Sequence, residues 1–163
     1  MKKFILALAV CATIASCQKK EDTDPIDVSK TTYLMHHSWK LAFYTVNPDI
    51  NDETSSPYDS LALMTTCQKD DIWKFGTTNR LTNYAMQKCV QTAPDSTVYG
   101  YELSSADKKF YVFTDPDLPD HATVYNADIT YPTIDSFVIT YTAPHPQDSS
   151  KTSRYVRAYV KQN

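Results

Sequence analysis

The chain has 163 residues, a formal net charge of −3 at pH 7 and only two glycines, Gly76 and Gly100. A phosphate-cradling loop or a dinucleotide-binding turn needs clustered glycines, so the composition argues against both kinds of nucleotide site, and no cofactor is expected. Lysine and arginine form no stripe or cluster along the chain, which argues against nucleic acid as a partner.

The first sixteen residues have the form of a secretory signal. Lys2 and Lys3 precede an apolar run from Phe4 to Ile14, which is too short to span a membrane. The run ends in Ile-Ala-Ser-Cys, and this end resembles the lipobox of bacterial lipoproteins. The resemblance implies cleavage after residue 16 and lipidation of Cys17 as the new N-terminus. An ordinary secretory signal, cut nearby, is the alternative.

Residues 17–30 are polar and charged and contain Pro25, so we expect the lipidated cysteine to lead into a flexible tether. Lys-Lys-Glu-Asp at 19–22 resembles the export signal of surface lipoproteins in Bacteroidetes. The resemblance implies an outer-membrane lipoprotein that faces the cell exterior, with the periplasmic face as the alternative. Two or more acyl chains would attach such a protein to the membrane without a spanning helix.

Residues 31–163 have the length of one domain and form a succession of strand-like segments. Alternation of apolar and polar residues, with many Tyr, Thr and Val, predicts eight strands. They cover 39–46, 72–75, 80–89, 97–104, 110–114, 122–129, 134–142 and 153–162. In the first of them, Trp39, Leu41 and Phe43 share one face, and Tyr44 lies on the other. Such an antiparallel meander closes into a barrel or folds into a sandwich.

One segment between the first and second strands has a helical pattern instead. Leu61 and Met64 are three residues apart, and Leu63 and Cys67 are four apart, so each pair shares a helix face. Asp59 or the serine after it could cap such a helix. We therefore expect one short helix between these two strands.

Several short motifs follow one another in an order that is typical of one protein family. Trp-Lys-Leu at 39–41 precedes Cys-Gln-Lys-Asp-Asp-Ile-Trp-Lys-Phe at 67–75, then Cys89, then Lys-Lys-Phe-Tyr-Val-Phe-Thr at 108–114. These residues resemble the lipocalin-like lipoproteins of Bacteroidetes, with their W-K-L and C-x-x-D-D-x-x-x-F motifs and later cysteine. The resemblance implies an all-β domain, an eight-stranded antiparallel lipocalin-like barrel over residues 31–163, in the cell envelope. It implies a binding role only in general terms.

Two cysteines remain in the exported domain, Cys67 and Cys89. One pair in an oxidising compartment predicts a disulfide, whose loop would stabilise the domain by about 3 kcal/mol. The alternative makes Cys67, Asp70 and Asp71 ligands of a metal ion. No histidine has zinc-like spacing from them, and adjacent aspartates on a strand point to opposite faces. We therefore expect no metal, one aspartate bonded to the backbone at the helix end or turn, and the other facing water.

No residue pattern predicts catalysis. The histidines are His36, His37, His121 and His145, and none belongs to a recognisable catalytic arrangement. No serine has the glycine-flanked setting of a nucleophile elbow. We expect a protein without catalytic residues, and a hydrolase is the most distant alternative.

Aromatic side chains are the strongest candidates for binding. Those expected inside a barrel, and taken as tentative ligand-binding residues, are Trp39, Phe43, Trp73, Phe75, Tyr99 and Tyr101. They could surround a small apolar ligand or fill a packed interior, which we favour because small eight-stranded barrels often have one. Tyr44, Tyr155 and Tyr159 are expected outside, where they could form a face for an envelope protein or a glycan. A non-enzymatic carrier of a small apolar ligand is the leading hypothesis, and such an interaction module is the alternative.

Overall fold

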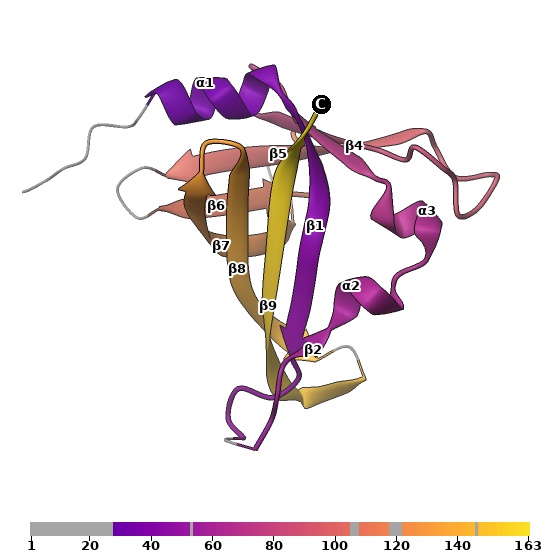
Figure 1. The fold of residues 1–163 in the computed structure, drawn as a ribbon, viewed down its shortest axis with the longest axis vertical. Helices are drawn as coiled ribbons and strands as arrows, with labels where there is room; N and C mark the ends of the chain where they lie inside the picture. The colour runs from indigo at the N-terminus through magenta and orange to yellow at the C-terminus, as the bar shows by residue number, and fades with distance from the viewer. Residues whose placement is uncertain (1–27, 53, 105–107, 118–121, 146) are drawn as a thin grey trace, which may run out of the picture.

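The strands form one antiparallel sheet that closes on itself as a barrel (Figure 1). The computed structural model describes residues 28–163 except 53, 105–107, 118–121 and 146. The eight barrel strands are β1 (Ser38–Asn47), β3 (Ile72–Phe75), β4 (Arg80–Tyr84), β5 (Ser96–Ser104), β6 (Lys109–Phe113), β7 (Thr123–Thr133), β8 (Ser136–His145) and β9 (Asp148–Gln162). Each of these strands pairs with the one that follows it in this order, and β1 pairs with β9 to close the ring. The predicted eight-stranded antiparallel barrel is therefore confirmed.

The segment between β1 and β3 leaves the sheet and runs beside it. A two-residue strand, β2 (Tyr58–Asp59), pairs with the far end of β1, and two short helices follow, α2 (Ser60–Leu63) and α3 (Thr66–Lys69). The sequence predicted one helix here. The chain is extended at Met64, where α2 ends, and α3 begins anew with the side chain of Gln68 accepting a hydrogen bond from the Thr65 N–H at 3.0 Å. As expected, Asp59 caps the first turn, accepting from the Ala62 N–H at 3.0 Å.

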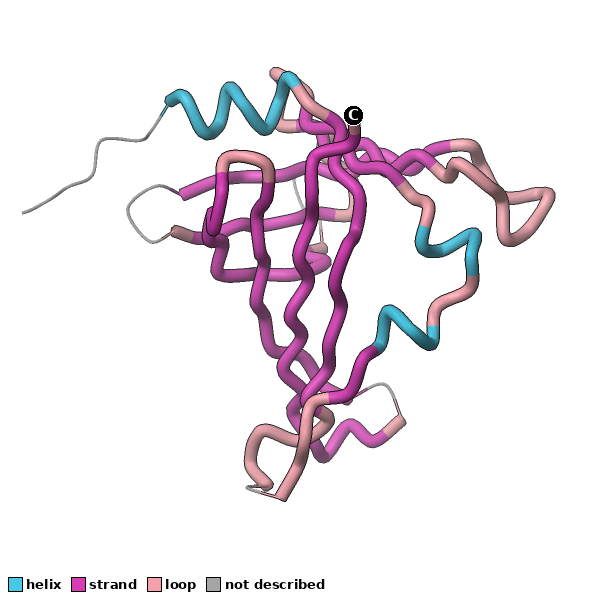
Figure 2. The backbone as a smooth tube through the Cα atoms, viewed as in Figure 1, coloured by secondary structure: helices cyan, strands magenta, loops and turns pink. Residues whose placement is uncertain are grey.

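A further helix, α1 (Val28–His36), lies across one end of the barrel (Figures 1 and 2). The sequence analysis did not anticipate it, and it begins within the residues expected to form the tether. Leu34 points into the barrel and is 1% exposed, and its carbonyl accepts a hydrogen bond from the Trp39 indole N–H at 2.9 Å. Tyr33 donates to Asp135, in the β7–β8 turn, at 2.6 Å. Helix α1 thus covers this end of the barrel.

None of the helices within the described part of the chain is long and apolar enough to cross a membrane.

A β-bulge in β1 changes which side chains of that strand face inward. Leu41 pairs with Tyr159 of β9, but Phe43 pairs with the next residue, Ala158, so Ala42 is an extra residue in β1. One extra residue reverses the alternation beyond it. Phe43 is consequently 47% exposed, and Tyr44 turns inward instead. The prediction that Phe43 lies inside the barrel is therefore wrong.

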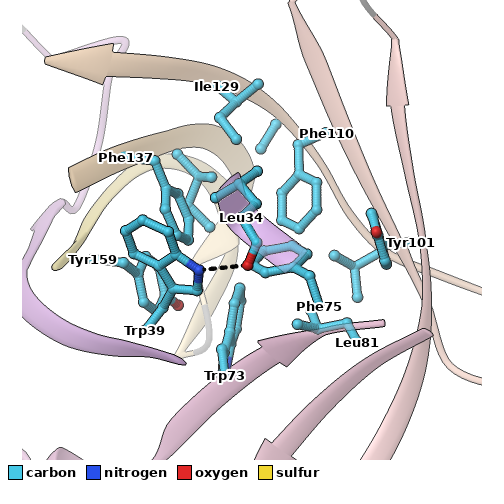
Figure 3. Close-up of a cluster of buried hydrophobic side chains, with 13 residues drawn as sticks. Leu34, Trp39, Trp73, Phe75, Leu81, Tyr101, Phe110, Ile129, Phe137 and Tyr159 are labelled. Carbon is cyan, nitrogen blue, oxygen red and sulfur yellow. Dashed lines mark hydrogen bonds between the residues drawn. The ribbon is translucent and has the colours of Figure 1, made fainter. Parts of the chain in front are cut away.

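The interior beneath α1 is densely filled with aromatic and aliphatic side chains (Figure 3). We call this the packed half; it is formed by Leu34, Trp39, Phe75, Leu81, Phe110 and Phe137. Trp39 meets Phe137 edge to face at 5.1 Å between ring centroids, and Phe75 meets Phe137 at 5.8 Å in the same manner. Full burial of each such side chain stabilises the fold by about 1.5–3 kcal/mol. This half contains the most fully buried large side chains of the described residues, among them Trp39, Phe110 and Phe137.

The disulfide between Cys67 and Cys89 is present, as predicted, with 5.3 Å between the two Cα atoms. It joins α3 to the connection that follows β4. The bond therefore ties the α2–α3 segment to the connection between β4 and β5.

Candidate ligand cavity

The interior beyond the packed half contains a cavity of about 330 Å³. Its aliphatic lining is Leu41, Met64, Val112 and Val124, its aromatic lining is Trp73, Tyr99, Tyr125, Tyr141 and Tyr159, and its polar lining is Gln68, Asp71, Asn83 and Arg157. Gln68 and Val124 are exposed, so the cavity opens to solvent beside α3 and the start of β7. The volume lies at the small end of the ~300–1,000 Å³ that small-molecule sites occupy.

The six aromatic residues expected to bind a ligand divide between the cavity, the packed half and the outer surface. Trp73 and Tyr99 line the cavity. Trp39 and Phe75 belong to the packed half, and Tyr101 packs beside it with its hydroxyl donating to the Gly76 carbonyl at 3.1 Å. Phe43, as the bulge requires, lies outside. The expectation of a packed interior thus describes one half of the barrel, and the expectation of a cavity describes the other.

Tyrosines from four strands form an aromatic group that we call the tyrosine wall: Tyr44 of β1, Tyr125 of β7, Tyr141 of β8, and Tyr155 and Tyr159 of β9. Tyr125, Tyr141 and Tyr159 line the cavity, and Tyr155 and Tyr44 continue the stack beyond it. Tyr125 stacks on Tyr141 at 5.1 Å, and Tyr141 stacks on Tyr155 at 4.9 Å. Tyr159 stacks on Trp73 at 4.5 Å, which joins the wall to β3.

The prediction that Tyr44, Tyr155 and Tyr159 lie on the outer face is wrong. Tyr155 is 7% exposed and Tyr159 is 3% exposed, because both fall on the inward phase of β9. Tyr44 is turned inward by the bulge and stacks on Tyr155 at 6.5 Å. The outer aromatic face that these three residues were expected to form is therefore absent.

Arg157 of β9 lies among the tyrosines with its side chain toward the cavity. The centre of its guanidinium is 4.5 Å from the centroid of the Tyr44 ring and 5.7 Å from that of Tyr141. Its Nε is fully buried, and no group in the described residues hydrogen-bonds to it. Burial would lower the pKa of Arg157, but the neighbouring tyrosines, chiefly Tyr159 and Tyr141, raise the pKa overall. The group is charged at any physiological pH.

The sequence analysis did not single out Arg157, because the opposite phase of β9, with Val156, Ala158 and Val160, is the more apolar one in the sequence. Pairing with β1 and β8 places Arg157 on the inward phase, together with Tyr155 and Tyr159. A charged residue on the inward phase of a barrel strand is unusual and points to an internal polar site.

Asp71 and Asn83 form a second polar group in the cavity wall. The Asn83 side-chain amide donates to Asp71 at 3.0 Å. The Asn83 carbonyl oxygen is buried and finds no partner among the described residues. Desolvation raises the pKa of Asp71, an effect that the Asn83 hydrogen bond opposes and the charge of Asp70 reinforces.

The expected roles of the two aspartates need correction. Asp70 ends α3 as its C-cap residue, but its buried Oδ1 has no hydrogen-bond partner within the described chain. One of the two aspartates was expected to bond to the backbone and the other to face water, and Asp71 does neither. It instead lines the cavity and pairs with Asn83, a long-range contact across β3 and β4 that local sequence does not encode.

Burial raises the pKa values of three hydroxyls in the cavity, those of Tyr125, Tyr141 and Tyr159. It raises the pKa of Tyr141 to about 12, and it raises the pKa values of Tyr125 and Tyr159 further above their usual range, although Arg157 opposes the effect. These hydroxyls are therefore neutral hydrogen-bond donors at physiological pH.

The remaining candidate residues lie elsewhere. No three His, Cys, Asp or Glu side chains of the described residues come together in a group that could hold a metal ion, and Cys67 is oxidised. Cys17 and His121 lie outside the described residues.

Comparison of the chain with family models and with curated protein sequences found no match.

Proposed function

We propose that the protein is a lipid-anchored lipoprotein of the bacterial cell envelope whose barrel binds a small, largely apolar molecule. The observation that carries the proposal is the 330 Å³ cavity, walled by aromatic and aliphatic side chains and open at one end. A concave, mostly apolar site with a few convergent polar groups is the usual form of a small-molecule site.

The division of the barrel into two halves supports a carrier role. The packed half and the Cys67–Cys89 disulfide hold the walls, so the cavity does not depend on the ligand for its shape. A rigid, preformed site loses less conformational entropy when a ligand binds.

A non-enzymatic role is part of this proposal.

The anchor rests on the sequence. The lipobox-like end of the signal makes Cys17 the lipidated residue, and the charged segment after it favours the outer face of the outer membrane. The barrel would then take its ligand at the cell surface.

The binding proposal is tested with N-phenyl-1-naphthylamine, a neutral apolar dye that fluoresces when it leaves water. We expect the barrel domain to bind it, and Val124→Trp to abolish binding, because residue 124 lies at the rim of the cavity. Val98→Trp is the matched control, since Val98 is similarly exposed, at 38% against 43%, and does not line the cavity. Equal loss of binding in both variants, or no binding by the unchanged protein, would refute the proposal.

The anchor is tested by labelling cells with radioactive palmitate. We expect the chain and its Cys11→Ala variant to be labelled and to fractionate with membranes, and Cys17→Ala to be neither. Label retained on the Cys17→Ala variant would place the lipid elsewhere.

A further inference from the structure

We propose that the ligand carries a carboxylate, bound by Arg157 deep in the cavity, with an apolar remainder lying against the aliphatic and aromatic walls. This inference rests on the proposed binding function and narrows its ligand to anionic amphiphiles. It starts from an arginine that forms an ion pair with no acidic residue in the part of the chain that the structure describes.

No carboxylate of the described residues forms an ion pair with Arg157. Ion pairs of the described residues join Arg80 to Asp117, Lys88 to Asp95, Lys109 to Asp128 and Lys161 to Asp135, and none involves Arg157. Removing a charge from water is costly unless it is paired and hydrogen-bonded. Its contacts with the Tyr44 and Tyr141 rings offset part of the cost. A bound anion would offset the rest.

The geometry around the guanidinium suits a carboxylate. Tyr44 covers the guanidinium at 4.5 Å from its ring centroid. A guanidinium stacked in this way still presents N–H groups along its edge, and these groups match the two oxygens of a carboxylate. The Nε is fully buried and has no hydrogen-bond partner among the described residues, so the guanidinium keeps hydrogen-bonding capacity that this part of the fold does not use. Tyr141 and Tyr159 supply protonated hydroxyls in the same cavity.

The acidic residue of the cavity lining, Asp71, orients such a ligand. Asp71 lines the same cavity but is already paired with Asn83. Its negative charge disfavours an anionic group beside β3, and the positive charge on β9 attracts one. The carboxylate therefore lies at the tyrosine wall, and the apolar part lies against Leu41, Val112 and Val124.

The test compares two ligands that differ only in charge, decanoate and decanol, as competitors of bound N-phenyl-1-naphthylamine at neutral pH. We expect decanoate to displace the dye at a lower concentration than decanol. Arg157→Gln should weaken decanoate by about 10- to 100-fold, since hydrogen bonds to a charged group contribute roughly 1.5–3 kcal/mol. Decanol should compete equally well in both proteins.

Arg154→Gln is the matched control, because Arg154 lies on the same strand, is exposed and does not line the cavity. It should leave both competitors unchanged. Arg157→Lys, which keeps the charge but lacks the planar fork, should fall between the unchanged protein and Arg157→Gln. If Arg157→Gln fails to fold, competition by decanoate and decanol is still compared on the unchanged protein and on Arg157→Lys. That comparison tests whether Arg157 binds the carboxylate.

The outcomes separate the two proposals. Dye binding with equal competition by decanoate and decanol, or an equal effect of Arg154→Gln and Arg157→Gln, overturns the carboxylate site and leaves the apolar cavity standing. Failure of the dye and of both competitors to bind overturns the proposed function, and this inference with it.

Discussion

The packed half and the cavity half of the barrel use the same strands for opposite purposes. Beneath α1, Trp39, Phe75 and Phe137 fill the interior completely. Further along β8 and β9, the tyrosine wall encloses Arg157 and an open volume of about 330 Å³. A core is stable when it is filled with apolar groups, whereas a binding site must keep space and polar atoms that the fold does not use. The difference leads us to expect that substitutions in the packed half lower stability and that substitutions in the cavity half alter the proposed ligand binding.

The largest expected effect is in the packed half. Trp39→Ala removes a fully buried indole and its hydrogen bond to Leu34, and should lower the free energy of unfolding by about 3–5 kcal/mol in urea titration. Phe43→Ala, four residues along the same strand but on the outer face, should cost less than about 1 kcal/mol. Equal costs would mean that the bulge at Ala42 is absent and that Phe43 is inside.

The disulfide is expected to have the next largest effect. Replacing Cys67 and Cys89 together by serine should lower the free energy of unfolding by about 3 kcal/mol, because the loop between them is no longer constrained in the unfolded chain. Thiol titration of the denatured, unreduced barrel domain should find no free thiol. A free thiol at either position, or an unchanged stability, would contradict the bond.

The cavity half should respond in the opposite direction to the packed half. Arg157→Met replaces a half-buried charge by an apolar chain of similar length, and should leave stability unchanged or raise it by about 1–2 kcal/mol. The same change should abolish the preference for decanoate over decanol. A loss of stability as large as that of Trp39→Ala would show that the arginine serves the fold and not a ligand.

The smallest expected effect is the pH dependence due to Asp71. The pKa of this carboxyl is raised in the folded protein, chiefly by desolvation, so the folded state holds the proton more tightly than the unfolded state. The free energy of unfolding therefore falls as the pH rises from the ordinary pKa of aspartate through the raised pKa of Asp71. Asp71→Asn should be slightly more stable than the unchanged protein at neutral pH.

The same two proteins should have equal stability in acid, where Asp71 is protonated in both states. Urea titration at both pH values measures the difference, and a gap that widens in acid would reverse the assigned direction. Asp71→Asn should also bind decanoate more tightly at neutral pH, since it removes a like charge from the cavity.

Local patterns predicted the strands because alternation reflects burial on a pleated surface. The eight barrel strands overlap the predicted segments, although β4 ends at Tyr84 and not at residue 89, and β9 begins at Asp148 and not at residue 153. The pairing of Cys67 with Cys89 follows from their count and setting. Alternation failed at Ala42 because a bulge inserts one residue without a signature in composition. It failed again at Tyr155 and Tyr159, where both phases of β9 contain large side chains and only closure against β1 shows which phase is inside.

The sequence by itself determined the all-β class, the order of strands, the disulfide and the candidate anchor at Cys17, since each depends on local pattern or on residue count. Only the tertiary structure decided that α1 covers one end of the barrel, that Trp39 and Phe75 are core, and that Arg157 and Asp71 share a cavity. Those facts depend on which residues meet when β1 pairs with β9 to close the barrel and when α2 and α3 lie beside the barrel. The proposal of a carboxylate site at Arg157 likewise depends on barrel closure, which places this arginine among tyrosines, with no acid of the described chain paired to it.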